Sequence, residues 1–456
     1  GLGAQPGAEA LGQRCCGLGG RRSCTGQNAL AGTGGVNFCD GIELMLGNVI
    51  VMSVSSEFGL GPNQRALMSM MTLLGLMVGH FVSGYVGDTY GRRTPTVWCY
   101  MVSTIVGFVC AFMPSFPCLV VARALLGLGM GFGMPPALAM ISEITPEGWR
   151  IAMRVGSSLS FSLGYLFITL VAAFDDPTYK NAHWRHLMLI AAVPSAVFWA
   201  VSWLFLMESP VFLAAINKHA EAKQVFRRMA WMNSTEHLDL DYAVPPGSNA
   251  PQDHADKEDP LSLRDQFRML FSRRLWFTTV AVFWAAFCVN LVAYGDGYAA
   301  PQVLAVTSSL PPAWQCVIKA AISVCWTVVA GMLAQVCSRK LMVIVAAVIS
   351  SSVCFAFAGA GSWPAPRPPF IAIIFQYGAN CSSMGSALGY VVIFQIAVEI
   401  YPTAASTTGG ALIMGGGRLA AIAAPLIFEN MRGATGQWTP FYYLLGTASA
   451  VAAVLV

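Results

Sequence analysis

Long apolar stretches, separated by short polar connections, run through most of the chain. Windows of about 20 apolar residues, the length that crosses the hydrocarbon core of a bilayer, predict twelve membrane helices. We expect them at residues 36–56, 65–87, 94–113, 118–141, 151–173 and 186–207, and then at residues 275–299, 312–336, 341–360, 370–396, 404–427 and 437–456. The pattern therefore indicates an all-α membrane protein.

The composition agrees with this pattern and excludes several classes of protein. Hydrophobic residues make up 56% of the chain and charged residues 11%, whereas soluble domains carry roughly 25% charged residues. A net charge of +4 is too small to indicate nucleic-acid binding. The 13 cysteines are scattered without zinc or disulfide spacing, and we find no catalytic triad, metal cluster or Walker-type loop. The sequence predicts no enzymatic activity, no metal and no cofactor.

Four segments are expected from the distribution of apolar and polar residues. Residues 1–35 are predicted to be a disordered tail, residues 36–208 a six-helix half, residues 209–274 a cytoplasmic loop, and residues 275–456 a second six-helix half. Within the loop, residues 217–232 and 261–275 are predicted to be amphipathic helices, and residues 244–260 a flexible linker. The chain starts without methionine and stops inside an apolar run, so both ends are expected to be incomplete.

Lysine and arginine set the expected orientation in the membrane. The even-numbered connections hold 15 of these residues and the odd-numbered ones hold 5, which places the even connections and both termini in the cytoplasm. Without the long central loop the ratio is 6 to 5, so the short loops alone would not decide the orientation, and Arg14, Arg21 and Arg22 of the tail favour the same one.

One connection carries a specific spacing of glycine, acid and arginine. Residues 84–93 contain Gly84, Asp88, Gly91, Arg92 and Arg93, and Gly91 suits a turn position with positive φ. Arginines alone would indicate only an ordinary cytoplasmic loop. The same spacing returns at residues 331–340, where glutamine and serine replace the acid and the turn glycine. The pattern Glu-Ile-x-Pro also occurs twice, at residues 143–146 and 399–402, so the two halves are predicted to be repeats.

Five charged residues are candidates for positions inside the membrane: Asp40, Glu43, Arg123, Lys319 and Arg418. Such charges are costly, so they are expected to face a partner or a cavity. Asp40 and Glu43 share a helix face, which disfavours ionisation of both and makes the pair a candidate for proton coupling. Alternatively, they lie in water at the start of the first helix.

The three basic residues of this set have different expected roles. Arg123 stays charged, so it needs Asp40, Glu43 or an anionic substrate as its partner, and a purely structural ion pair remains an alternative. Arg418 is a candidate gate or substrate contact. Lys319 lies near one end of its helix and is expected to extend its amine towards the membrane surface.

Polar side chains that share a helix face are candidates for the substrate path. They are Ser158, Ser162 and Tyr165 in the fifth predicted helix, Asn290 and Tyr294 in the seventh, and Gln376, Asn380 and Ser383 in the tenth. The alternative is that they hold helices together by hydrogen bonds.

These motifs together resemble the major facilitator superfamily, in its sugar-porter-like branch and near the synaptic-vesicle-glycoprotein-related transporters. The resemblance is carried by residues 84–93, Arg123 and its glycines, residues 143–150, 184–185 and 208–210, then residues 40–43, 399–403, 417–418 and Pro425. It implies the major facilitator fold, with twelve helices in two six-helix pseudo-repeats that work by alternating access. It also implies a cytoplasmic gate, for which the candidates are Gly84, Asp88, Gly91, Arg92, Arg93, Glu143, Arg150, Arg339 and Glu399.

The second copy of the gate departs from the family pattern. It has Gln335 and Ser338 at the acid and glycine positions, and Ser406 where an arginine is expected after Pro402. We therefore expect the second copy to form a weaker gate than the first.

The sequence predicts a monomeric, multi-pass transporter of a small polar or charged organic solute, coupled to protons. Its partners are expected to be the solute, protons and the lipid bilayer. Two alternatives remain open at this stage: a facilitative uniporter for a sugar-like solute, and a non-transporting receptor or scaffold with the same fold.

Overall fold

The computed structural model describes residues 32, 34–145, 150–216, 218–232, 263–307, 309–364, 366–400 and 406–456. Most of the predicted disordered tail, the predicted linker at residues 244–260, and both Glu-Ile-x-Pro prolines lie outside these ranges.

Twelve long helices occur in the described part of the chain, and each matches one predicted span. The first half contains α3 (Gly35–Phe58), α4 (Pro62–Tyr90), α5 (Arg93–Cys110), α6 (Phe116–Ile144), α7 (Arg150–Asp175) and α8 (Trp184–Phe205). The second half contains α12 (Trp276–Thr307), α13 (Pro312–Val336), α14 (Arg339–Ser362), α15 (Pro369–Glu399), α16 (Ser406–Thr435) and α17 (Thr439–Leu455). Within the described residues, nine of them are long and apolar enough to cross a membrane, and α17 is a shorter apolar helix. The predicted all-α membrane fold is confirmed.

Two helices extend eight residues past their predicted ends. The seventh span is predicted to end at residue 299, but α12 continues through Pro301 to Thr307. The eleventh is predicted to end at residue 427, but α16 continues through Glu429 and Arg432 to Thr435. Neighbouring helices in a bundle can satisfy the backbone group that a proline frees, and a paired charge is tolerated inside a helix. The extension of α12 places residues near 296 in the middle of a helix rather than near its end.

Three short helices lie between the two halves in sequence: α9 (Pro210–Ala215), α10 (His219–Met232) and α11 (Leu263–Leu270). In α10, Phe226 and Met229 are fully buried, and they belong to one cluster with Val97, Met140 and Leu206 of the first half. The predicted amphipathic helix is confirmed, and it caps the end of the first half.

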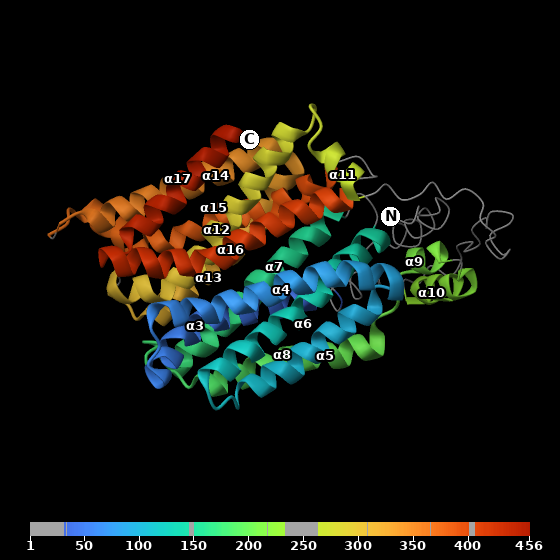
Figure 1. Cartoon of the computed structure of the whole chain (residues 1–456), viewed down its shortest axis with the longest axis horizontal. Coiled ribbons are helices and arrows are strands. Elements are labelled where there is room, and N and C mark those ends of the chain that lie inside the picture. Colours follow the sequence, from blue (N-terminus) through green and yellow to red (C-terminus); the bar gives the residue numbers. More distant parts are fainter. Residues whose placement is uncertain are drawn as a thin grey trace.

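The two halves lie side by side, with the first half in blue to green and the second in yellow to red (Figure 1). They meet mainly where α7 packs against α13 and where α4 packs against α16. We call the end of the bundle where α4 meets α5 and where α9 and α10 lie the proximal end. The opposite end, where α3 meets α4, is the distal end.

Glycines allow α6 to approach two neighbours closely. A Cβ added at Gly127 would lie 2.0 Å from the backbone oxygen of Thr72 in α4, and one at Gly129 would lie 2.4 Å from Val102 in α5. Gly131 and Gly133 repeat this alternation between α4 and α5. Glycines at every second residue therefore serve two faces of one helix.

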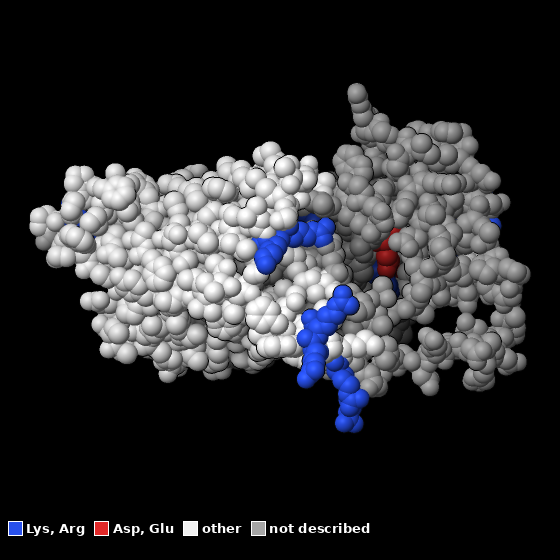
Figure 2. All heavy atoms as spheres, turned by 90° about the horizontal axis from the view of Figure 1, so that it is seen from above, with Lys and Arg blue, Asp and Glu red and all other residues white. Residues whose placement is uncertain are grey.

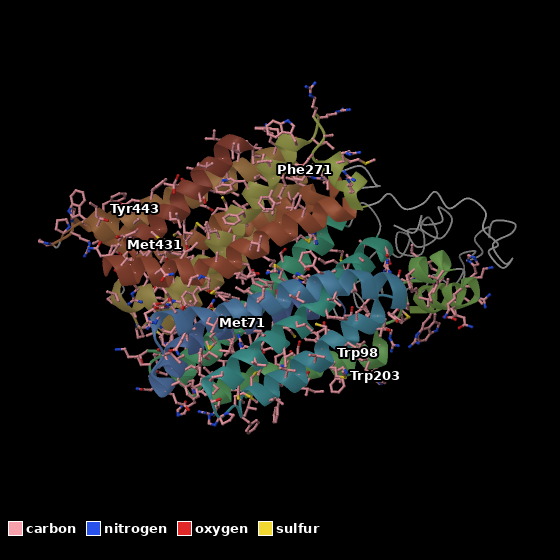
Figure 3. All side chains as sticks on the ribbon, viewed as in Figure 1. Met71, Trp98, Trp203, Phe271, Met431 and Tyr443 are labelled. Carbon is pink, nitrogen blue, oxygen red and sulfur yellow. The ribbon has the colours of Figure 1, made fainter. Side chains whose placement is uncertain are left out.

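The outer surface of the bundle suits a membrane. Trp98 and Trp203 are exposed near the proximal end of the first half, as Phe271 is in the second half, whereas Tyr443 lies towards the distal end (Figure 3). Aromatic residues at both ends of a bundle are typical of membrane interfaces. Figure 2 shows one face of the molecule on which the described surface is mostly uncharged and the visible Lys and Arg side chains gather towards one end.

The contact between α4 and α6 yields a test of the packing. Replacing Gly127 by alanine forces the two backbones apart, and overpacking of this kind costs about 1–3 kcal/mol. Gly156→Ala is the matched control, because an added Cβ there meets nothing within 4 Å. We expect the purified Gly127→Ala protein to unfold at a lower temperature than the unmodified chain, and Gly156→Ala to be unchanged or more stable. Equal unfolding temperatures for the two variants would contradict the close approach of α4 and α6.

Candidate functional site

A cavity of about 160 Å³ lies between the two halves. Its walls come from α3, α6 and α7 of the first half and from α12, α13, α15 and α16 of the second. Five predicted substrate-path residues line it, and these are Ser158, Ser162, Tyr165, Tyr294 and Arg418. Ser162 and Thr327 are within hydrogen-bond distance across the cavity, at 3.2 Å between their hydroxyl oxygens.

The other predicted substrate-path residues lie elsewhere. Asn290 donates to the backbone of its own helix, and its oxygen accepts a 2.7 Å hydrogen bond from Tyr390. Asn380 donates to Gln315 at 2.6 Å, and Gln376 donates to Ser309 at 2.9 Å. These side chains hold elements of the second half together and do not line the cavity. The side chain of Ser383 lies outside the described part.

Arg123 and Glu43 form a fully buried ion pair within the first half. Arg123 Nη1 lies 2.9 Å from Glu43 Oε2, and Arg123 Nη2 donates to the backbone oxygen of Glu43 at 3.1 Å. The two residues are 1% and 2% exposed, and neither lines the cavity. Of the two acids that the sequence left open as the partner of Arg123, the structure brings Glu43 to it.

Asp40 is in a different position from Glu43, although both lie on α3. It lines the cavity, and it is 3% exposed rather than open to water. Among the described residues, neither of its carboxylate oxygens has a hydrogen-bond partner. A buried polar group without a partner is costly, so this carboxyl group is suited to bind a proton or a ligand.

Arg418 lines the same cavity from the second half. Its guanidinium donates to the hydroxyl of Tyr294 and lies 5.5 Å from the centroid of the Tyr294 ring. It also approaches the sulfur of Met134, in the first half, at 3.9 Å. Arg418 interacts electrostatically with Asp40, but no hydrogen bond or ion pair joins these two described side chains.

Lys319 differs from its expected position. It is buried, at 3% exposed, and forms an ion pair with Asp296 of α12. Ser382 donates to Asp296 Oδ2, the oxygen that Lys319 contacts, and Tyr442 donates to Asp296 Oδ1 at 2.7 Å. The expectation that Lys319 reaches the membrane surface is wrong, because the longer α12 places an acid beside it in the bundle. The sequence did contain a signal for this ion pair, because Asp296 and Lys319 lie in consecutive predicted spans.

The turn between α4 and α5 has the predicted glycine geometry. Gly91 has a φ of 97°, and a Cβ there would overlap the carboxylate of Glu208. This carboxylate accepts the backbone N–H of Arg92 at 2.7 Å and that of Arg93 at 3.2 Å. Glu208, which the sequence analysis placed in a family motif but not in the gate, is therefore central to this turn.

The Arg92 side chain also contacts a second acid, Glu143, and we call Gly91, Arg92, Arg93, Glu143 and Glu208 the proximal cluster. The Arg92 side chain lies 3.1 Å from Glu143 and 4.6 Å from the centroid of the Phe212 ring, and it donates to the backbone oxygen of Gly87 at 2.6 Å. Burial raises the pKa of Glu143 above its ordinary value, although the Arg92 guanidinium opposes this shift. The Arg93 guanidinium donates to the backbone oxygen of Trp203 at 2.9 Å.

All of these described gate contacts lie within the first half and the short helix α9 that follows it. They join α4, α5 and α6 to α8, α9 and the segment between them. Gly84 lies near the end of α4, and Arg339 is exposed at the start of α14. The side chains of Asp88, Arg150 and Glu399 lie outside the described part, so a closure between the halves at this end stays a prediction.

A polar network joins the two halves at the distal end, and we call it the distal lock. It consists of Arg65 of α4 together with Glu429, Tyr298, Gln302 and Arg432 of the second half. Arg65 lies 2.9 Å from Glu429, which also accepts hydrogen bonds from Tyr298 at 2.8 Å and Gln302 at 3.2 Å. Arg432 donates to Gln302 at 2.6 Å. Arg65 and Arg432 are two of the five basic residues counted for the odd-numbered connections, and the sequence did not predict their contacts.

Comparison with known proteins agrees with this architecture. The sequence model of the family described as "Sugar (and other) transporter" matches residues 47–456. In fold, the chain resembles a partially occluded inward open structure of the xylose transporter XylE from E. coli, with a TM-score of 0.73 and 19% sequence identity. This similarity covers 94% of the present chain and 95% of the other.

Curated relatives are similar over shorter stretches. Organic cation/carnitine transporter 7 of Arabidopsis thaliana is 30% identical over 219 residues, which are 48% of this chain and 41% of the relative. Synaptic vesicle 2-related protein of Xenopus laevis is 28% identical over 201 residues, which are 44% of this chain and 36% of the relative. The chain thus spans less than half the length of these relatives. The predicted resemblance is nevertheless confirmed: the chain belongs to the sugar (and other) transporter family, in the sugar-porter-like branch of the major facilitator superfamily.

Proposed function

We propose that this protein is a secondary transporter that carries a small polar or charged organic solute across a membrane by alternating access. The observation that carries this proposal is the cavity between the halves, which has a guanidinium on one side and, on the other, an acid without a hydrogen-bond partner among the described residues. Such a site between two pseudo-repeats is where facilitator-type transporters place their substrates. The family supports the same reading, because its description and its relatives' names refer to transporters.

Proton coupling belongs to this proposal, and the geometry supports Asp40 as its main residue. Glu43 is held by Arg123, so of the two buried acids of α3, Asp40 is the one that can exchange a proton without leaving a buried base unpaired. One solved structure of similar fold is a D-xylose–proton symporter, with a TM-score of 0.69. A facilitative uniporter is the closest alternative, and it differs in needing no proton gradient.

Alternating access requires contacts between the halves that form in one state and break in another. The distal lock meets this requirement because Arg65 and Glu429 belong to different halves. Close to it, the backbone N–H of Ala313 donates to the oxygen of Pro177 at 3.1 Å, again across the halves. We infer that the described conformation is closed at the distal end.

Uptake into proteoliposomes tests the proposed coupling. The unmodified chain is expected to accumulate its solute when a proton gradient is imposed. Asp40→Asn is expected to lose this accumulation but to keep solute exchange at equal concentrations, because the site remains while the proton acceptor is gone. Glu221→Gln, which alters an exposed acid of α10, is the matched control. Proton-driven accumulation that survives Asp40→Asn would refute the coupling role and favour another acid.

The buried pair predicts a large effect on stability. Glu43→Gln leaves the Arg123 charge buried without its partner, and the expected loss in free energy of unfolding is about 3–5 kcal/mol. The double variant Glu43→Gln with Arg123→Met removes both charges and is expected to recover most of this loss. Denaturant unfolding in mixed micelles measures both. A double variant no more stable than the single one would show that the orphaned arginine is not the cause.

Accessibility of the cavity tests the distal lock. Arg65→Ala is expected to favour conformations that are open at the distal end. A cysteine introduced as Ser158→Cys should then react several-fold faster with a membrane-impermeant maleimide added on the distal side. Arg185→Ala is the control, because its pair with Glu57 lies at the same end but within the first half. Equal labelling rates in both variants would exclude a gating role for Arg65.

A further inference from the structure

Four charged side chains line the cavity among the described residues: Asp40, Asp296, Lys319 and Arg418. Two are acids and two are bases, so the cavity is electrically balanced when all are ionised. Asp296 is paired with Lys319 and receives two further hydroxyl donors, which leaves neither of these charges free. The charges that remain available are those of Asp40 and Arg418, which face the cavity from different halves.

The groups around Asp40 do not change this balance. Those that interact with it or with Arg418 are Cys39 and Glu43 of α3, His80 of α4, Cys99 of α5, Tyr294 of α12 and Tyr390 of α15. Thiols and phenols are neutral at physiological pH. His80 is half-buried and interacts electrostatically with the positive Arg418, which disfavours a second positive charge. The Glu43 charge is balanced by Arg123.

Protonation of Asp40 therefore leaves one unbalanced positive charge in the cavity, on Arg418. A net charge inside the bilayer is costly, and a bound anion removes it. A planar guanidinium matches a carboxylate well because two parallel N–H groups can bind its two oxygens. Arg418 is suited to bind a carboxylate. Its guanidinium donates to the Tyr294 hydroxyl, and its other described hydrogen-bond contact is only the Met134 thioether sulfur at 3.9 Å.

We infer that the transported solute is a small monoanion, such as a hydroxylated carboxylate, which binds Arg418 when Asp40 carries a proton. This inference rests on the proposed transport function and names its substrate class. One proton and one anion then move together, and the cavity is neutral both when empty and when loaded. Cationic solutes are disfavoured by Arg418, and neutral solutes leave the charge of the protonated site unbalanced. Hydroxyl groups of the solute find partners in Ser158, Ser162 and Thr327 on the cavity wall.

Binding with proton uptake tests this inference directly. The purified, reconstituted protein is titrated in weak buffer with D-gluconate, D-sorbitol and D-glucamine, which share a six-carbon skeleton but carry charges of −1, 0 and +1. Acetate and D-glycerate serve as smaller anions. At least one carboxylate is expected to bind with uptake of about one proton, and its affinity should rise about tenfold for each unit of falling pH while Asp40 is ionised.

Substitutions at Asp40 and at Arg418 test the role of each residue separately. Asp40→Asn resembles the protonated acid, so it is expected to bind the same anion with no proton uptake and with an affinity independent of pH. Arg418→Gln is expected to weaken anion binding at least thirtyfold, and Arg418→Lys to restore part of it. Arg185→Gln, at the exposed distal surface, is expected to leave binding unchanged. A solubility and thermal-unfolding profile like that of the unmodified chain confirms that each variant is folded.

The outcomes distinguish the substrate class from the transport function. If D-sorbitol or D-glucamine binds more tightly than every carboxylate, the anion inference is overturned while proton-coupled transport stands. Anion binding without proton uptake, or with unchanged pH dependence in Asp40→Asn, also overturns it. If no carboxylate binds, the inference fails, and uptake of other solutes in proteoliposomes then decides whether the chain transports at all.

Discussion

The cost of a charge inside the bilayer organises this protein. An unpaired ion in the middle of a membrane helix costs about 2.5–3.5 kcal/mol even on lenient scales, so each buried charge has to find its opposite within the bundle. Glu43 finds Arg123, Asp296 finds Lys319, and Glu429 finds Arg65. Each pair joins two different helices, so the requirement for charge neutrality helps to fix how the helices pack. Asp40 and Arg418 are the exceptions among the described residues that line the cavity, and this is why we place function there.

The position of a pair relative to the cavity separates structural from functional roles. The Glu43–Arg123 pair lies outside the cavity and is closed on all sides, which suits an interaction that stabilises the first half in every state. The proximal cluster around Arg92 and Glu208 is also confined to the first half in its described contacts. Both groups of residues belong to motifs that resemble the family. Their described contacts nevertheless hold the first half together and do not connect it to the second half.

Periodicity and apolar length were sufficient to predict the helices, because a membrane span must satisfy its own backbone and cover itself with apolar side chains. The same reasoning ended two helices too early, since Pro301 and Glu429 break the apolar pattern without breaking the helix. Because the seventh span was predicted to end at residue 299, Asp296 was expected close to the end of its helix. Lys319 was therefore not predicted to have an acidic partner inside the bundle. The distal lock was missed for a related reason. Pairing between residues as far apart in sequence as Arg65 and Glu429 depends on how the halves dock, and no local pattern records it.

Only interactions that cross between the halves can couple chemistry to alternating access. When the halves move as rigid bodies, the energy of a pair inside one half stays constant, so Glu43–Arg123 and Asp296–Lys319 contribute equally to every state. The attraction between Asp40 and Arg418 changes with the distance between α3 and α16, and so does that between Arg65 and Glu429. A proton bound to Asp40, or an anion bound to Arg418, directly weakens the attraction between Asp40 and Arg418. In the proposed mechanism, these two charge pairs, one at the cavity and one at the distal end, are therefore described ionic interactions through which binding can be linked to movement between the halves.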